Sequence, residues 1–457
     1  MIGKIYVEDT MYHCNIRYNL AYKFTGNLDF KLFDSCTQTV LSGIEKFSWE
    51  QVPDSKGNPE WCKKAVKADP PNVAVITCSE IDHTFAEFSR DIFSTDRKYS
   101  GFPLFFTVLH RNPADGGDSE FMIIETINHA YADGRSAELV FNKICDLYLA
   151  EKAGDRKKAA DIVASLKQIS TIPSSMVAGG KPDSLIRMKF RHRLKNMFRL
   201  ITYKLRDEGK FSIPFSRIKQ EFEIMKNRPH ELPVMKYFDI NPLVTYARSI
   251  YPEINPNAVI CSVLTRAMNR LCTERRIKTS GRVSFRMMSD ILSARARTRL
   301  MGNYSAYMPV TADGSGKFED TALQIHEWVS TFRAQKIDAS MYNFLEFATR
   351  RKLIGKQDDP ISFTYTLVIN RRMEKHPDLL GTAHFTRMIG SLNCEPRNPA
   401  GAMMNNKIMP AVTLSRNNVM FVTFYPLPVA ESSRILNSVA DAIGDEIREL
   451  TAGIIHE

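Results

Sequence analysis

The residues best suited to chemistry lie in the segment Asn128-His129-Ala130-Tyr131-Ala132-Asp133-Gly134. A neutral imidazole is a good general base at neutral pH, because its unperturbed pKa is about 6.5. His129 is therefore suited to take a proton from an attacking nucleophile. The alternative is a structural histidine at a strand end, followed by an ordinary Asp-Gly turn.

The flanking sequence predicts the elements that position this segment. Residues 121–127 are mostly apolar and β-branched, which is typical of an interior strand. The residues that follow are apolar at helical spacing: Ala137, Val140, Phe141, Ile144, Leu147 and Tyr148. His129 and Asp133 are thus predicted on a tight strand-to-helix turn, where rigid elements hold side chains accurately.

Other segments extend this pattern on both sides. Strands are predicted at 18–25, 102–110, 282–288, 363–370 and 418–425, and helices at 28–47, 255–271 and 432–450. The loop 112–118 has the turn residues of a hairpin between two of the strands. The chain therefore alternates strands and helices in both halves.

Composition limits the class of protein. The chain has 457 residues, 44% hydrophobic and 25% charged, which indicates a globular protein of two domains of about 200 residues each. No apolar run approaches the roughly 20 residues of a membrane-spanning helix, and the first residues lack a secretory layout. The eight scattered cysteines form no Cys-x-x-Cys pair. We expect reduced thiols in a cytoplasmic protein, without zinc or a disulfide framework.

The net charge of +11 favours anionic partners, such as nucleic acid, a membrane surface or a polyanionic small molecule like coenzyme A. No nucleic-acid-binding module accompanies it. Lys, Arg and Ser become frequent after residue 151, and Ala178-Gly179-Gly180-Lys181-Pro182 breaks the pattern. We therefore predict an N-terminal domain at 1–180, a basic connection at 181–231 and a C-terminal domain at 232–457.

Within that connection, residues 186–206 carry eight Lys or Arg and an apolar stripe of Phe190, Leu194, Met197, Phe198, Ile201 and Leu205. This is a basic amphipathic helix pattern, and three interpretations stay open. The stripe docks the helix on its own protein, with the basic residues solvated. Alternatively, the helix lies on an anionic membrane, or its charges sit near a coenzyme A phosphate.

The strand, the His-x-x-x-Asp-Gly motif and the helix, about a third of the way along the chain, resemble the chloramphenicol-acetyltransferase-like superfamily. This group includes condensation domains of nonribosomal peptide synthesis, plant-type acyl-CoA acyltransferases, alcohol acetyltransferases and wax-ester synthases. Its usual motif begins His-His, and here the first position is Asn128. The resemblance implies an α/β (α+β) fold of two sandwich domains, with the active site in a channel between them. The C-terminal Asp-Phe-Gly-Trp-Gly of the plant enzymes is absent.

The resemblance also implies roles for single residues. His129 matches the general base, Asp133 a structural acid that pairs with an arginine, and Gly134 the small residue beside the acyl-thioester channel. Arg295 is the candidate partner of Asp133. Its alternatives are Arg286 and Arg297, or a merely solvated basic loop.

Two weaker matches lie in the second half. Gly302-Asn303 after the basic loop resembles the corresponding region of the superfamily's second domain. Thr366, or Thr364 on the same predicted strand, is the candidate donor to the oxyanion. The family's Ser-Asn on a C-terminal strand is replaced by Ile369-Asn370.

The predicted activity is acyl transfer from acyl-CoA, as co-substrate, to a small-molecule hydroxyl or amine, directly in a ternary complex. No other cofactor or metal is expected, and the setting fits natural-product biosynthesis. The sequence lacks a His-Glu-x-x-His zinc motif, a complete phosphate-binding loop and a Gly-x-Ser-x-Gly elbow. The alternatives are a free-standing condensation enzyme that uses an acyl-carrier protein, a lipid acyltransferase that contacts membrane through 186–206, and a non-catalytic scaffold.

Overall fold

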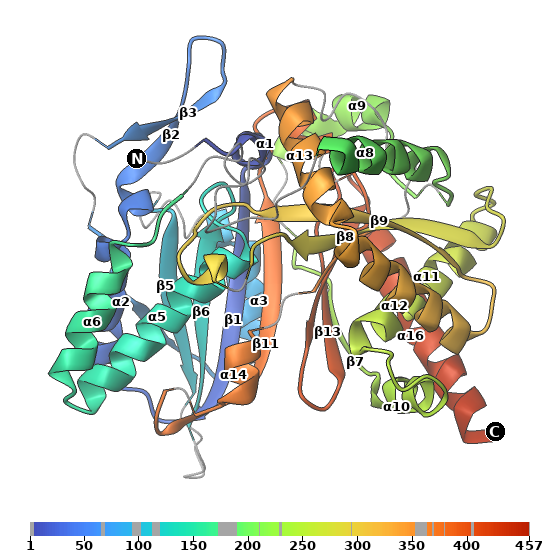
Figure 1. Cartoon of the computed structure of the whole chain (residues 1–457). Coiled ribbons are helices and arrows are strands. Elements are labelled where there is room, and N and C mark those ends of the chain that lie inside the picture. Colours follow the sequence, from blue (N-terminus) through green and yellow to red (C-terminus); the bar gives the residue numbers. More distant parts are fainter. Residues whose placement is uncertain are drawn as a thin grey trace. The chain divides into compact units, whose positions relative to one another are not determined.

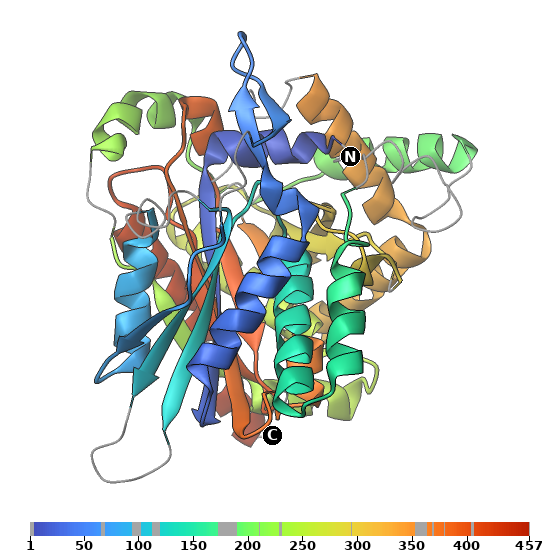
Figure 2. The same ribbon diagram turned by 90° about the vertical axis from the view of Figure 1, so that its left-hand side faces the viewer.

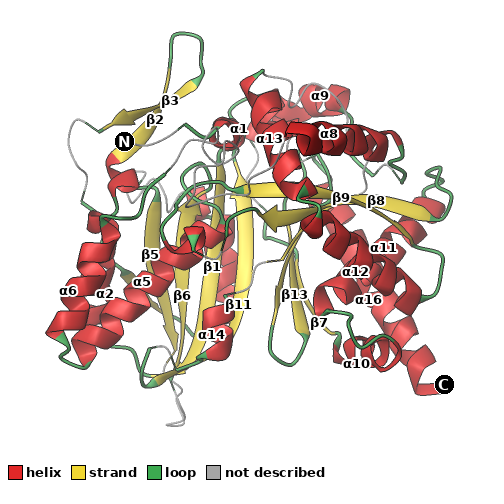
Figure 3. Cartoon of the chain, viewed as in Figure 1, coloured by secondary structure: helices red, strands yellow, loops and turns green. Residues whose placement is uncertain are grey.

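The computed structural model, coloured along the sequence in Figure 1, divides into two compact units. The first unit comprises residues 1–185, 292–304 and 369–395, and the second comprises 186–291, 305–368 and 396–457. The structure describes residues 4–456 except 65–68, 94–101, 112–118, 172–189, 210, 228–230, 294, 352–362, 368–369, 379 and 404–405. Both units combine helices with a mixed sheet (Figure 3), so the predicted α/β class is confirmed.

The sheet of the first unit has the strand order β11-β1-β6-β5-β4. Its strands are β1 (Ile16–Gly26), β4 (Ala74–Thr77), β5 (Leu104–Arg111), β6 (Glu120–Asn128) and β11 (Ala383–Cys394). All neighbours are antiparallel except β4 and β5. Arg17 lies opposite Asn128 and Phe24 opposite Phe121, so the end of β6 that precedes the motif lies beside the start of β1.

Helices cover this sheet on both faces (Figure 2). On one face lie α2 (Phe30–Gly43), α5 (Gly134–Lys152) and α6 (Arg156–Leu166), and α3 (Ile81–Arg90) packs against β5 and β11. Phe141 of α5 stacks on Tyr22 of β1 with ring centroids 4.0 Å apart. On the other face, Asn19 of β1 donates to the Ser89 hydroxyl of α3 at 3.2 Å. The predicted apolar residues of α5 are all buried, which confirms that the helix packs by its stripe.

Shorter elements complete the first unit. They are α1 (Tyr6–Cys14), the 3-10 helix η1 (Glu45–Ser48), the hairpin of β2 (Trp49–Pro53) and β3 (Pro59–Lys63), the 3-10 helix η2 (Ala296–Thr298) and α14 (Arg371–Lys375). The long helix predicted at 28–47 is thus divided into α2 and η1. Asn370, predicted at a strand end, instead caps α14 by accepting from the Arg372 and Met373 amides.

The sheet of the second unit has the order β7-β13-β12-β10-β8-β9. Its strands are β7 (Met235–Asp239), β8 (Arg282–Asp290), β9 (Ser305–Asp313), β10 (Phe363–Leu367), β12 (Pro410–Leu414) and β13 (Val419–Phe424). Its helices are α8 (Phe190–Leu205), α9 (Phe215–Lys226), α10 (Asn241–Ile250), α11 (Pro256–Glu274), α12 (Phe318–Ala334), α13 (Ile337–Arg350), α15 (Pro399–Ala402) and α16 (Ser432–His456). Asn255 caps α11 and Pro256 is its first residue, as predicted. None of the helices described in either unit is both long and apolar enough to cross a membrane.

The predicted boundaries 1–180, 181–231 and 232–457 divide the chain into continuous segments, whereas each observed unit consists of three separate segments. Residues 292–304 and 369–395 belong to the first unit, because β11 pairs with β1 and residues 302–304 bind the turn after β6. Helices α8 and α9, within the predicted connection, belong to the second unit. The predicted break at 178–182 and the hairpin loop 112–118 lie outside the described residues.

Candidate active site

The turn between β6 and α5 is fixed by hydrogen bonds within the first unit. The His129 amide donates to the Ile16 carbonyl of β1 at 3.0 Å, and the Tyr131 amide donates to the Asn128 carbonyl at 2.9 Å. The Asn128 side-chain oxygen accepts from the Ala130 amide at 3.0 Å. Asn128, at the position where the superfamily has a histidine, therefore helps to close the turn.

Asp133 holds the other end of the turn and is almost fully buried. It is the N-cap of α5, where Oδ1 accepts from the Ser136 amide at 2.9 Å, and Oδ2 accepts from the Tyr304 amide at 3.0 Å. A carboxylate at this place is stabilised by the cap hydrogen bond and by the helix dipole. Each carboxylate oxygen thus binds a backbone amide, which is a structural role.

Residues 302–304, far away in sequence, complete the turn. The Gly302 carbonyl accepts from the Asp133 amide at 3.3 Å and from the Ser136 hydroxyl at 2.9 Å. The Asn303 amide Nδ2 donates to the His129 carbonyl at 2.9 Å. A Cβ on Gly302 would lie 2.7 Å from Ile5 Cδ1 and 3.0 Å from Tyr304 Cε2, so a larger residue would force these side chains to move. The sequence indicated Gly302-Asn303 only by resemblance, and it gave no signal for Ser136.

His129 is half-buried, with its ring edge-on to Tyr18 at a centroid distance of 5.0 Å. Its Nδ1 is the buried ring nitrogen and makes no hydrogen bond of good geometry with the described residues. Burial lowers the pKa of His129, and its own backbone, Asp133 and Asn303 oppose that shift. A histidine whose pKa lies below its ordinary value is neutral at pH 7, and so it is available as a base.

A buried ion pair contacts Asn303, which binds the turn. Lys46 Nζ lies 2.6 Å from Glu8 Oε1, and both side chains are nearly inaccessible. The Trp61 indole N–H donates to Glu8 Oε2 at 3.1 Å. Burial raises the pKa of Glu8 to about 7, against the opposing effects of Lys46, Trp61 and Asn303. The pair therefore joins α1, η1 and β3 to the Asn303 side chain that binds the turn.

The β2–β3 hairpin also contacts the motif directly. The Tyr131 hydroxyl donates to the Trp49 carbonyl at 3.0 Å, and the ring of Trp61 lies edge-on to Tyr131 at 4.8 Å. A hydrogen bond and an aromatic contact thus reach the turn from one short hairpin. The sequence carries no local signal for Glu8, Lys46 or Trp61, because their contacts span long sequence separations.

The structure brings His129, Asp133 and Gly134 together in one turn, with Gly134 as the first residue of α5. Arg295 and Arg297 lie on the same unit at η2 with exposed side chains, and the pairing of Arg295 with Asp133 stays a prediction. Arg286 belongs to the second unit, where it pairs with Asp207.

Thr366 lies on β10 in the second unit, half-buried and opposite Ala411. Its neighbour Thr364 is buried on the same strand. A role for either hydroxyl at the oxyanion stays a prediction, as does the channel between the domains.

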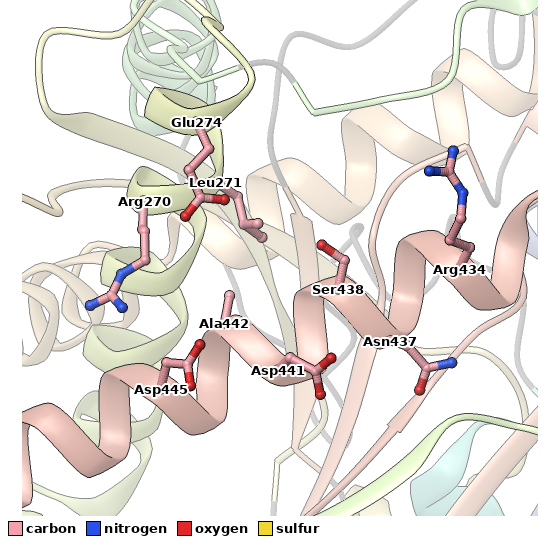
Figure 4. A pocket seen from close by; sticks show the side chains of 9 residues that line it. All are labelled: Arg270, Leu271, Glu274, Arg434, Asn437, Ser438, Asp441, Ala442 and Asp445. Carbon is pink, nitrogen blue, oxygen red and sulfur yellow. The ribbon is translucent and has the colours of Figure 1, made fainter.

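A separate hollow lies in the second unit between α11 and α16 (Figure 4). It is lined by Arg270, Leu271, Glu274, Arg434, Asn437, Ser438, Asp441, Ala442 and Asp445. Arg270 already pairs with Glu446 at 2.8 Å and Glu449 at 2.6 Å. None of the predicted site residues lines this hollow. Across the described residues of both units, no group of three or more His, Cys, Asp or Glu is placed to hold a metal ion.

Solved structures with a similar fold exist, although sequence comparisons find no match. No family model and no curated protein matches the sequence. Among solved structures, the trichothecene 15-O-acetyltransferase TRI3 of Fusarium sporotrichioides is similar with a TM-score of 0.61 and 9% identity, over 95% of this chain and 92% of that one.

Two condensation domains are similar over comparable lengths. The starter condensation domain of rhizomide synthetase, solved as a mutant with C8-CoA and a leucine thioester analogue, has a TM-score of 0.59 and 11% identity, over 99% of this chain and 94% of that one. The first condensation domain of the calcium-dependent antibiotic synthetase has a TM-score of 0.58 and 12% identity, over 99% and 96%.

Proposed function

Because the chain has the fold of the chloramphenicol-acetyltransferase-like superfamily, as its sequence predicted, we propose that it is an acyltransferase with His129 as general base. The observation that carries the proposal is the turn that holds His129. Its backbone is fixed by Ile16 on one side and by Asn303 on the other. Burial also keeps the imidazole neutral at pH 7.

In the proposed reaction, a hydroxyl or amine of the acceptor gives its proton to Nε2 of His129 as it attacks the thioester carbonyl. The new carbon–oxygen or carbon–nitrogen bond forms, the carbon–sulfur bond breaks, and the thiolate takes the proton back from His129. Nδ1 is buried, so Nε2 is the nitrogen that serves as the base. Asp133 positions the turn, since its two oxygens bind backbone amides.

We propose acyl-CoA as the donor and a small-molecule alcohol or amine as the acceptor. The similar O-acetyltransferase and the condensation domain solved with C8-CoA favour a thioester donor. The net charge of +11 also suits a polyphosphate-bearing co-substrate. A donor carried by an acyl-carrier protein is the second candidate, favoured by the likeness to condensation domains.

The test is the release of free thiol from a panel of acyl-CoAs mixed with alcohols and amines. We expect acceptor-dependent release, and a loss of more than about 100-fold in His129→Ala, since general-base catalysis contributes about 10²–10⁴-fold. The rate should stay level at neutral pH and fall only at a pH below the ordinary histidine pKa of about 6.5, because burial lowers the pKa of His129.

His110→Ala is the matched control, because His110 lies on β5 of the same sheet with its ring edge-on to Phe30 at 5.2 Å. Its turnover should equal that of the unmodified protein. Full activity in His129→Ala would refute the base. Release of thiol only from an acyl-loaded carrier protein would show that the carrier protein, and not acyl-CoA, is the donor. No release of thiol from either donor would favour the non-catalytic scaffold.

A further inference from the structure

The apolar stripe of α8 faces solvent instead of the protein. The exposed fractions of its side chains are 41% for Leu194, 42% for Met197, 60% for Phe198, 49% for Ile201 and 82% for Leu205. Spacings of three and four residues place all five on one side of the helix. These five side chains therefore do not dock the helix on its own protein, and the side chain of Phe190, the sixth residue of the stripe, lies outside the described residues.

A different face of α8 attaches the helix to the second unit. Asn196 is buried and donates to the Gln335 carbonyl at 3.1 Å and to the Ser340 hydroxyl at 3.0 Å. Tyr203 packs edge-on against Trp328 of α12 with ring centroids 5.0 Å apart. The helix is thus already anchored without its stripe, which leaves the stripe available to a partner.

The charge of the helix indicates which partner. Helix α8 carries five Lys or Arg and no Asp or Glu. Arg191 and Lys195 are exposed beside the stripe, and Arg206 is exposed just past its end. Exposed Leu, Phe and Ile flanked by basic side chains are typical of helices that lie in the interface of an anionic bilayer.

Helix α13, which packs against α8, adds to this character. It exposes Phe344 and Phe347 at 44% and 53%, and the Arg351 guanidinium lies 5.8 Å from the Phe347 ring. Exposed large apolar side chains thus occur on both of these packed helices.

We propose that α8 is a peripheral docking helix, which inserts Leu194, Phe198 and Ile201 into the surface of an anionic membrane. The basic side chains beside the stripe face the lipid phosphates. This inference is independent of the acyl-transfer chemistry, because every residue in it lies in the second unit and the expected readout is binding rather than turnover.

The test is sedimentation of the whole chain with vesicles of phosphatidylcholine, with and without phosphatidylserine. We expect binding only where phosphatidylserine is present. The pair Phe198→Gln and Ile201→Gln should weaken binding at least tenfold. The set Arg191→Gln, Lys195→Gln and Arg206→Gln should also weaken it at least tenfold, since each basic side chain at an anionic surface contributes about fivefold.

Ile224→Gln is the matched control, because Ile224 is an equally exposed apolar residue (56%) on α9 of the same unit. It should leave vesicle binding unchanged, and all variants should unfold at the temperature of the parent. Failure to sediment with either vesicle would overturn the proposal, and so would binding that the Phe198 and Ile201 changes leave intact. A dimer that these changes dissociate, without vesicle binding, would assign the stripe to a second copy of the chain.

Discussion

Helices α5 and α8 have the same kind of sequence pattern and opposite relations to the protein. In α5 the apolar residues are buried against the sheet, and Phe141 stacks on Tyr22. In α8 the apolar stripe is exposed, and Asn196 is one of the residues that attach the helix. Helical periodicity therefore predicts that a stripe exists, but not that the protein itself covers it.

The difference lies in what surrounds each stripe. The stripe of α5 follows a buried strand after a short turn, so the sheet is the nearest apolar surface. In α8 basic residues lie beside the stripe, and their charges are costly to bury without partners. A polar contact through Asn196 lets the helix attach while those charges stay hydrated.

The largest expected difference between the two helices is in stability. Phe141→Ala should lower the free energy of unfolding by about 3–5 kcal/mol, because it leaves a cavity under α5. Phe198→Ala, on the exposed stripe of α8, should change it by less than about 0.5 kcal/mol. Urea denaturation of the two variants measures both values, and equal losses would contradict the opposite orientations of the stripes.

The N-terminus of α5 should be the next most sensitive place. Asp133→Ala removes the cap and leaves the buried Tyr304 amide without its acceptor, which should cost about 2–4 kcal/mol. Asp155→Ala, at the exposed cap of α6, should cost about 1 kcal/mol. Thermal unfolding compares the two. Turnover should fall in the Asp133 variant alone, and a normal rate there would contradict a positioning role.

The smallest effect concerns the attachment of α8. Asn196→Ala should cost about 1–2 kcal/mol, since two hydrogen bonds are lost and the Gln335 carbonyl loses a donor. Met197→Ala, at the next residue but on the exposed stripe, should cost far less. Proteolysis within α8 should be faster in Asn196→Ala than in Met197→Ala. Faster proteolysis of Met197→Ala would mean that the stripe is buried in solution.

The strand-to-helix turn could be predicted because its signals are local. Apolar residues 121–127, the motif and the helical stripe are contiguous, and the structure confirms β6 and α5 there. The partners of the turn leave no local signal. Tyr304 lies 171 residues beyond Asp133, and Glu8 lies in a helix with no resemblance to a site motif.

Strand β11 could not be predicted for a related reason. The adjacent polar pair Thr386-Arg387 breaks the alternation of polar and apolar residues at the register shift of this strand, and Gly390 interrupts its middle. Its pairing with β1, more than 350 residues earlier, is what makes it a strand. Tertiary context of this kind overrides weak local propensity.

The pairing of β11 with β1 also sets an order for biosynthesis. When synthesis has reached residue 185, β1 is still an edge strand because β11 has not been made. The Oδ2 atom of Asp133 also lacks its donor, the Tyr304 amide. An uncovered edge of this kind invites pairing with other chains. The first 185 residues are therefore an incomplete domain, and the first unit becomes whole only when almost the entire chain has been synthesised.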